Sequence, residues 1–262
     1  MTDFLHIERD GAIAIVTLNR PQTRNALTDE DAVGELLAMC EAVNRDRSVS
    51  VVILTGAGPA FSAGGNLKQI GELGRGALGE PAQTRYFYRD GIQRVPLALC
   101  HLEVPTIAAV NGPAIGAGND LACMCDIRIA SQKATFAESF VKLGLIPGDG
   151  GAWLLQRALG ASRACEMAYT GEAISAAQAL EWGLVSQVVA EQELMPAALD
   201  LARRIASNPS DALRMTKRLM LESRHARLPD VLELSAALQA LAHNTQAHQD
   251  ALGTMMARLA AR

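Results

Sequence analysis

Two carboxylates in the segment "FAESFVKLGLIPGDGG" (136–151) are placed where acid–base chemistry is possible. Glu138 and Asp149 lie eleven positions apart, and Phe140, which cannot carry a proton, stands between them. A third carboxylate, Asp120, follows a glycine-rich loop at the expected start of a helix. Partial desolvation there would raise its pKa and suit it to proton transfer, but an acid at a helix N-terminus also stabilises the helix dipole. The sequence leaves both roles of Asp120 open.

Two loops dense in glycine and alanine, "GAGPAFSAGGNLK" (56–68) and "NGPAIGAGNDLA" (111–122), each follow an apolar, β-branched run. Their small side chains leave backbone N–H groups accessible where a helix is expected to start. Donors fixed in this way stabilise the negative charge that develops on a carbonyl oxygen during reaction. Two such loops after consecutive buried strands therefore predict an oxyanion-binding site.

Two other chemistries fit these loops less well. A dinucleotide-binding turn would need a third glycine where Phe61 stands, and Pro59 removes one of the N–H groups that would bind a pyrophosphate. A serine-hydrolase elbow around Ser62 would need glycine at Ala60, and no histidine lies in either loop. Both functions are disfavoured.

The elements that must position these loops are predicted by periodicity. Phe4–Arg9 and Ile13–Asn19 alternate around Asp10-Gly11 and predict a hairpin. A helix is expected over Thr28–Arg45, with Thr28 as its N-cap. Continuous apolar runs predict strands that are buried on both faces in a βαβ-type core: Val49–Thr55, Thr106–Val110 and Ile127–Ala130.

The pattern becomes purely helical near residue 190. We expect an α/β core over 1–190 and a helical region over 191–262, whose apolar stripes must pack on the core or on another subunit. The helices expected in that region are Glu193–Ser207, Ser210–Arg227, Leu228–Leu241 and Gln246–Ala260.

The composition of the chain argues against several classes of binding partner. A formal net charge of −4 gives no basic surface for nucleic acid or an anionic membrane. Five cysteines with scattered spacing suit a reducing compartment, and a cytoplasmic location is expected. Cys123 and Cys125 have neither a second pair nor a nearby histidine, so no metal site is expected.

In combination and order, several segments resemble the crotonase superfamily, the enoyl-CoA hydratase/isomerase family, over nearly the whole chain. The resemblance implies a ClpP/crotonase-like α/β fold, with a ββα spiral core that binds acyl-CoA and a helical C-terminal region for oligomerisation. It rests on "LNRPQTRNAL" (18–27), "FSAGGNLK" (61–68), "PTIAAVNGPAIGAGNDLACMCDIRIAS" (105–131), "LGLIPGDGG" (143–151) and "YTGEAISAAQALEWGLVSQVV" (169–189).

The resemblance also implies roles for individual residues. In that family two backbone N–H groups polarise the thioester carbonyl of an acyl-CoA, and the matching positions are Gly65 and Ala117. Coenzyme A is part of the substrate, and no separate cofactor is implied. The positions that match the coenzyme A site are Arg24, Ala26, Ala63, Gly64, Asn66, Leu67 and Lys68.

Hydratases of this family use two glutamates. The first aligns with Asp120, the second aligns with Phe140, and Asp149 lies one position beyond a catalytic aspartate of some family isomerases, which falls on Gly148. Since moving a double bond needs one base, whereas hydration uses an acid–base pair, we expect enoyl-CoA isomerisation with Asp120 or Asp149 as the base. The alternatives are hydration by a non-standard pair and a catalytically inactive protein that binds CoA thioesters. A homotrimer or a dimer of trimers is implied.

Overall fold

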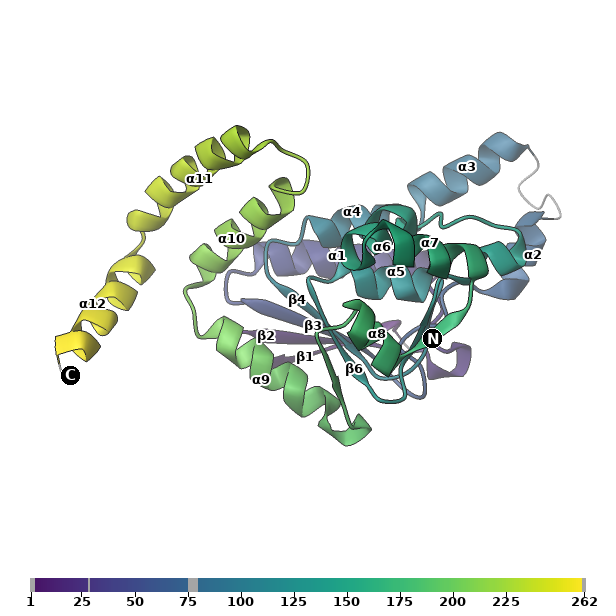
Figure 1. Cartoon of the computed structure of the whole chain (residues 1–262), viewed down its shortest axis with the longest axis horizontal. Coiled ribbons are helices and arrows are strands. Elements are labelled where there is room, and N and C mark those ends of the chain that lie inside the picture. The colour runs from purple at the N-terminus through teal and green to yellow at the C-terminus, as the bar shows by residue number, and fades with distance from the viewer. Residues whose placement is uncertain (1–2, 28, 75–79, 261–262) are drawn as a thin grey trace.

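A computed structural model describes residues 3–27, 29–74 and 80–260 of the chain. Its main sheet has the strand order β1-β2-β3-β4-β6-β9, and a small second sheet has the order β5-β7-β8 (Figure 1). β1 runs antiparallel to β2, while the other pairs of the main sheet are parallel. The strands are β1 (Leu5–Asp10), β2 (Ile13–Leu18), β3 (Val51–Gly56), β4 (Thr106–Val110), β5 (Ala114–Ile115), β6 (Ile127–Ser131), β7 (Thr135–Ala137), β8 (Ala173–Ser175) and β9 (Gln187–Val189).

The expected hairpin is confirmed, and strands form at the three apolar runs with shifts of at most two residues at their ends. β6 is half-buried at Ile127 and Arg128 and buried from there on, so full burial is confirmed only for β3 and β4. β3 and β4 consist of residues that are buried on both faces, apart from Gly56. Helices therefore cover the main sheet on each side, as continuous apolar strands require. The helices are α1 (Glu30–Arg45), α2 (Leu67–Gly74), α3 (Pro81–Asp90), α4 (Arg94–Cys100), α5 (Ala117–Met124), α6 (Gly151–Leu159), α7 (Ala161–Thr170), α8 (Ala176–Trp182), α9 (Leu194–Ala206), α10 (Ser210–Glu222), α11 (Leu228–His243) and α12 (Gln246–Ala260), with short 3₁₀ turns η1 (Pro21–Thr23), η2 (Ser139–Leu143) and η3 (Glu191–Glu193).

Two cores meet at the main sheet. One face packs against α1, α4 and α5, and the opposite face is covered by α9 (Figure 1). Leu194, Ala198 and Ala202 of α9 recur every four residues and are buried against strand side chains such as Ile53 and Ile107. α9 is thus a layer of the sheet's own core, although it lies beyond the boundary expected near residue 190.

The N-cap of α1 differs from the expected one. Thr28 lies outside the described residues, and Asp29 performs the capping: its side chain accepts a hydrogen bond from the Ala32 amide at 2.8 Å. Asp29 also pairs with Arg20 at 2.8 Å, which ties the start of α1 to the end of the hairpin.

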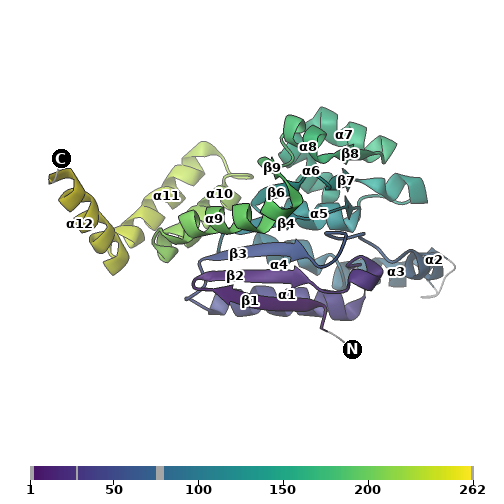
Figure 2. The same cartoon turned by 90° about the horizontal axis from the view of Figure 1, so that it is seen from below.

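α10, α11 and α12 form an arm that extends away from the sheet, on the side opposite α2 and α3 (Figures 1 and 2). The sequence predicted all three helices, but α10 ends at Glu222 and not at Arg227. Arg227 is instead the extended N-cap of α11, which carries Pro229 in its first turn. α11 and α12 bury no side chain within the described chain.

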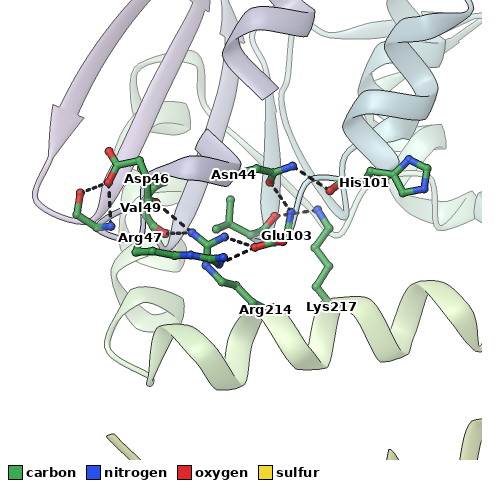
Figure 3. Close-up of polar contacts among 10 residues, drawn as sticks. Asn44, Asp46, Arg47, Val49, His101, Glu103, Arg214 and Lys217 are labelled. Atoms are coloured by element: carbon green, nitrogen blue, oxygen red, sulfur yellow. Dashed lines mark hydrogen bonds and ion pairs between the residues drawn. The ribbon is translucent and has the colours of Figure 1, made fainter. Parts of the chain in front are cut away.

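A buried arginine joins α10 to the sheet (Figure 3). Arg214 donates to Glu103 at 2.7 Å and to the carbonyl oxygens of Asp46 and Val49 at 3.1 and 3.0 Å. One turn later, Lys217 donates to the Val104 carbonyl at 2.8 Å. These contacts fix the base of the arm on the loops at one end of the sheet.

No helix in the described part of the chain is both long enough and apolar enough to cross a membrane.

Candidate functional site

The first loop is held in place by Asn25, a residue in the left-handed conformation (φ 57°) whose side chain is fully buried. Its amide nitrogen lies 3.0, 2.9 and 3.1 Å from the carbonyl oxygens of Ala57, Ala60 and Phe61. Its side-chain oxygen Oδ1 accepts a hydrogen bond from the backbone N–H of Arg20 at 2.9 Å. Asparagine suits this position because it tolerates positive φ and both donates and accepts.

The two glycine-rich loops lie against each other. Ser62 donates its amide to the Pro113 carbonyl at 3.1 Å, and the Ile115 amide donates to the Ser62 carbonyl at 3.0 Å. A Cβ atom at Gly64 would overlap the Ile115 carbonyl oxygen, and one at Gly118 would overlap the Ser62 carbonyl oxygen. Both glycines are therefore required for the close approach of the loops.

A cleft of about 1160 Å³ opens where these loops meet, and Gly65 and Ala117 both border it. Ala117 is the first residue of α5, so its N–H has no acceptor within the helix. Within the described part of the chain, the hydrogen bonds use neither the Gly65 amide nor the Ala117 amide. The structure thus brings together two small residues whose amides are unused at one cleft.

Asp149 is a buried carboxyl on the wall of the same cleft, 4% exposed. Burial raises the pKa of Asp149 to about 6. The phenol of Tyr88, on α3, lies close enough that burial and then the Asp149 charge raise the pKa of Tyr88. Gln93 donates to the Gly148 carbonyl at 2.8 Å and so holds the turn that carries Asp149.

Asp120 and Glu138 lie deeper, and neither borders the cleft. Their side chains are 0% and 1% exposed, and the Asn119 amide donates to Glu138 at 3.0 Å. Burial, followed by the charges of Glu138 and Asp149, raises the pKa of Asp120 well above its usual value. Asp120 therefore lies near the cleft without reaching it, and the choice of base between Asp120 and Asp149 stays a prediction.

Phe140 occupies the position of the second family glutamate and borders the cleft. Its ring lies against Gly116, where a Cβ atom would be 3.5 Å from the ring edge. The Phe140 ring cannot exchange a proton, and it gives the cleft an apolar surface where it lies against the second loop.

Only some of the residues matched to the coenzyme A site lie at the cleft. Ala63 and Leu67 border the cleft, while Ala26 and Gly64 are buried in the loops. The remaining members, Arg24, Asn66 and Lys68, are exposed and do not border it. Their roles in binding coenzyme A stay predictions.

Sequence reasoning missed Asn25, Tyr88 and Gln93. A signal for Tyr88 was present, since the aromatic run 86–88 stands out in a chain with only 4% aromatic residues. The long-range hydrogen bonds of Asn25 and Gln93 leave no trace in local spacing. Among the described residues, no group of three or more histidine, cysteine, aspartate or glutamate side chains could hold a metal ion.

The α/β fold, with two glycine-rich loops and a buried carboxyl at one cleft, defines an enzyme of the crotonase type. A family model for enoyl-CoA hydratase/isomerase matches residues 8–258, and the chain belongs to that family.

Comparisons with known proteins agree with this assignment. The chain is 36% identical to the 1,2-epoxyphenylacetyl-CoA isomerase of Escherichia coli K12, over 98% of this chain and 97% of that protein. It is also 36% identical to the short-chain-enoyl-CoA hydratase of Clostridium acetobutylicum, over 94% and 92% of the two chains. The crystal structure of an enoyl-CoA hydratase from Bacillus anthracis superposes with a TM-score of 0.90 at 32% identity, over 97% and 96%.

Proposed function

We propose that this enzyme isomerises the double bond of an enoyl-CoA, with Asp149 as the base. The observation that carries the proposal is the position of Asp149, a buried carboxyl on the same cleft as Gly65 and Ala117. Family membership supports an acyl-CoA substrate, but relatives named as hydratases and as an isomerase occur at the same identity.

The proposed chemistry starts at the thioester. The Gly65 and Ala117 amides donate to the thioester oxygen and stabilise the enolate that forms when a proton leaves the acyl chain. Each such donor contributes about 3–4 kcal/mol to transition-state stabilisation in other enzymes. Asp149 accepts the proton at one carbon and returns it at another, so the double bond moves and no water is added.

Phe140 supports isomerisation over hydration. Hydration requires one group to activate water and a second group to deliver a proton. An apolar ring at the second position removes one of these groups. Hydration by a rearranged pair, such as Asp149 with Tyr88, is the second candidate, because Tyr88 and Asp149 border the same cleft.

Aromatic side chains at the cleft also suggest the kind of acyl group that the enzyme accepts. Phe140 and the helix α3 residues Tyr86, Phe87 and Tyr88 border the cleft. Apolar and aromatic walls suit a bulky or alicyclic acyl chain. The Escherichia coli relative is named for an epoxyphenylacetyl-CoA, which also carries a ring.

The direct test is incubation with 3-enoyl-CoA and 2-enoyl-CoA substrates in deuterated water, followed by mass spectrometry. Isomerisation predicts interconversion of the two substrates with deuterium at the reacting carbons and no gain of water. Rapid formation of 3-hydroxyacyl-CoA would refute the proposal in favour of hydration. Acyl-CoA binding by calorimetry without turnover of any substrate would favour an inactive binding protein.

We further propose that the arm helices assemble the chain into a homotrimer or a dimer of trimers. The arm exposes large apolar side chains that include Leu232, Leu241 and Met256, which are 59–63% exposed in a single chain. Burying them between subunits would be favourable by roughly 25 cal/mol per Å² of apolar area. Sedimentation equilibrium should give three or six chains per particle, and a monomer at micromolar concentration would refute this assembly.

A further inference from the structure

Asp120 and Glu138 converge on the first residue of α6. A Cβ atom at Gly151 would overlap both Asp120 Oδ1 and Glu138 Oε1, so each carboxyl reaches the Gly151 backbone. Within the described residues, no N–H group donates to either oxygen of Asp120 or to Oε1 of Glu138. Gly151 lies two residues after Asp149, and the carboxyl pair therefore packs directly behind the turn that presents Asp149 to the cleft.

Asp120 and Glu138 cannot both be ionised in this environment. Among the described residues, no lysine or arginine forms an ion pair with Asp120 or Glu138, and the two carboxyls are fully buried. Two ionised carboxylates side by side in such a site repel each other and lose their hydration, so the pair retains a proton. The other titratable groups facing the cluster are Asp149, Cys123 on the same helix and Tyr88, which faces Asp149.

The hydrogen bonds decide which carboxyl holds the proton. Glu138 accepts from the Asn119 amide at 3.0 Å, which favours its ionised form. Burial raises the pKa of Glu138 to about 7, and the hydrogen bonds from Asn119 and Asp120 oppose that rise. Asp120 is more strongly shifted by burial and by the charges of Glu138 and Asp149.

We propose that Asp120 stays protonated at neutral pH and donates its hydroxyl to Glu138, which makes the two a positioning pair for the turn that carries Asp149. Asp120 then donates to Glu138, and it is not available as a base. Its protonation follows from the buried pair alone; only its positioning role rests on the proposed function of Asp149.

Infrared spectroscopy tests the protonation without any turnover. Protein with ¹³C-labelled aspartate carboxyls is measured in deuterated buffer at about pH 7, well above the ordinary pKa of aspartate and glutamate. The wild type should show the C=O band of a protonated aspartate, which persists in Asp149→Asn and is lost in Asp120→Asn. Absence of the band in the wild type, or its loss in Asp149→Asn alone, would overturn the proposal.

Kinetics test the positioning role. Asp120→Asn keeps an N–H donor toward Glu138, whereas Asp120→Ala removes it. For a positioning residue we expect Asp120→Asn to retain at least ~10-fold more kcat than Asp120→Ala and Asp149→Asn, with the acid limb of its pH profile still set by Asp149. A loss in Asp120→Asn equal to that in Asp149→Asn would overturn this role.

Failure of the proposed function and failure of the proposed protonation of Asp120 give different results. If the enzyme turns over no enoyl-CoA, the proposed function fails and the infrared result still decides the protonation of Asp120. Should Asp120→Asn fail to fold, Glu138→Gln provides a second variant, because the pair then lacks its carboxylate acceptor and the aspartate band should shift. An unchanged aspartate band in Glu138→Gln would refute the hydrogen bond between them.

Discussion

Asp149 combines burial with access to the cleft. Its side chain is 4% exposed, and burial raises its pKa to about 6. A raised pKa makes the carboxylate a stronger base while leaving it ionised at neutral pH, which is the condition that general base catalysis requires.

This shift predicts the pH dependence of the reaction. Only ionised Asp149 can accept a proton, so kcat/KM should fall about tenfold per pH unit below the pKa near 6 and level off above it. Initial rates with a 3-enoyl-CoA from acid to neutral pH measure this limb. Asp149→Asn should lose ~10²–10⁴-fold activity along with the limb. A limb that persists in Asp149→Asn would assign the base to another group.

Replacing Phe140 with a carboxylate should change the reaction that the enzyme catalyses. Phe140→Glu places a carboxylate on the cleft wall at the position that matches the family's second glutamate, so enoyl-CoA hydration should rise by at least ~10-fold over the wild type. The gain is measured as 3-hydroxyacyl-CoA formed from a 2-enoyl-CoA. Phe140→Gln is the matched control, since it adds similar polarity without an ionisable group. Equal hydration by both variants would contradict the argument.

At the scale of elements, the site depends on the contact of two loops. Gly118→Ala places a methyl group on the Ser62 carbonyl oxygen and must push the loops apart. We expect ~1–3 kcal/mol of destabilisation and a loss of kcat larger than any change in KM. Urea unfolding and steady-state kinetics measure both effects.

Gly253→Ala is the control for this substitution. Gly253 is a glycine of α12 with nothing within 4 Å of a new Cβ atom. Alanine there should be neutral or stabilise the helix by up to ~1 kcal/mol. If Gly118→Ala behaved like Gly253→Ala, the close packing of the loops would not matter for catalysis.

Elements with strong local patterns could be predicted, and those defined by distant contacts could not. The hairpin, β3, β4 and the arm helices were predicted from apolar periodicity or continuous β-branched runs. β5 and β8 were missed because they span only two and three residues, too short for any period. The family motifs predicted that Gly65 and Ala117 share one site. The burial of Asp120 could not be predicted, because it depends on how α6 packs over α5.

At the scale of the whole molecule, one buried cation links the arm to the sheet (Figure 3). The Arg214 side chain is 6% exposed and bonds to Glu103 and to two backbone carbonyl oxygens. Arg214→Ala would remove the side-chain donor to the Val49 carbonyl oxygen and leave the Asp46 carbonyl oxygen with the Val49 amide alone, so we expect ~2–4 kcal/mol of destabilisation. Hydrogen exchange should show faster exchange in α10 and the loop near Val49.

Arg218→Ala is the matched control on the same helix. Arg218 pairs with Glu222 one turn away while 54% exposed, and such pairs contribute at most ~0.5 kcal/mol. Equal destabilisation by the two variants would show that the buried contacts of Arg214 are not what holds α10.

The central claim is that the Gly65 and Ala117 amides polarise one thioester oxygen. Raman difference spectroscopy of a bound, ¹³C-labelled acyl-CoA measures the stretching frequency of that carbonyl directly. We predict a lower frequency on the enzyme than in water, retained in Asp149→Asn and largely lost in Ala117→Pro, which removes one N–H at a position where a helix tolerates proline. A carbonyl frequency on the wild-type enzyme equal to that in water would contradict the account.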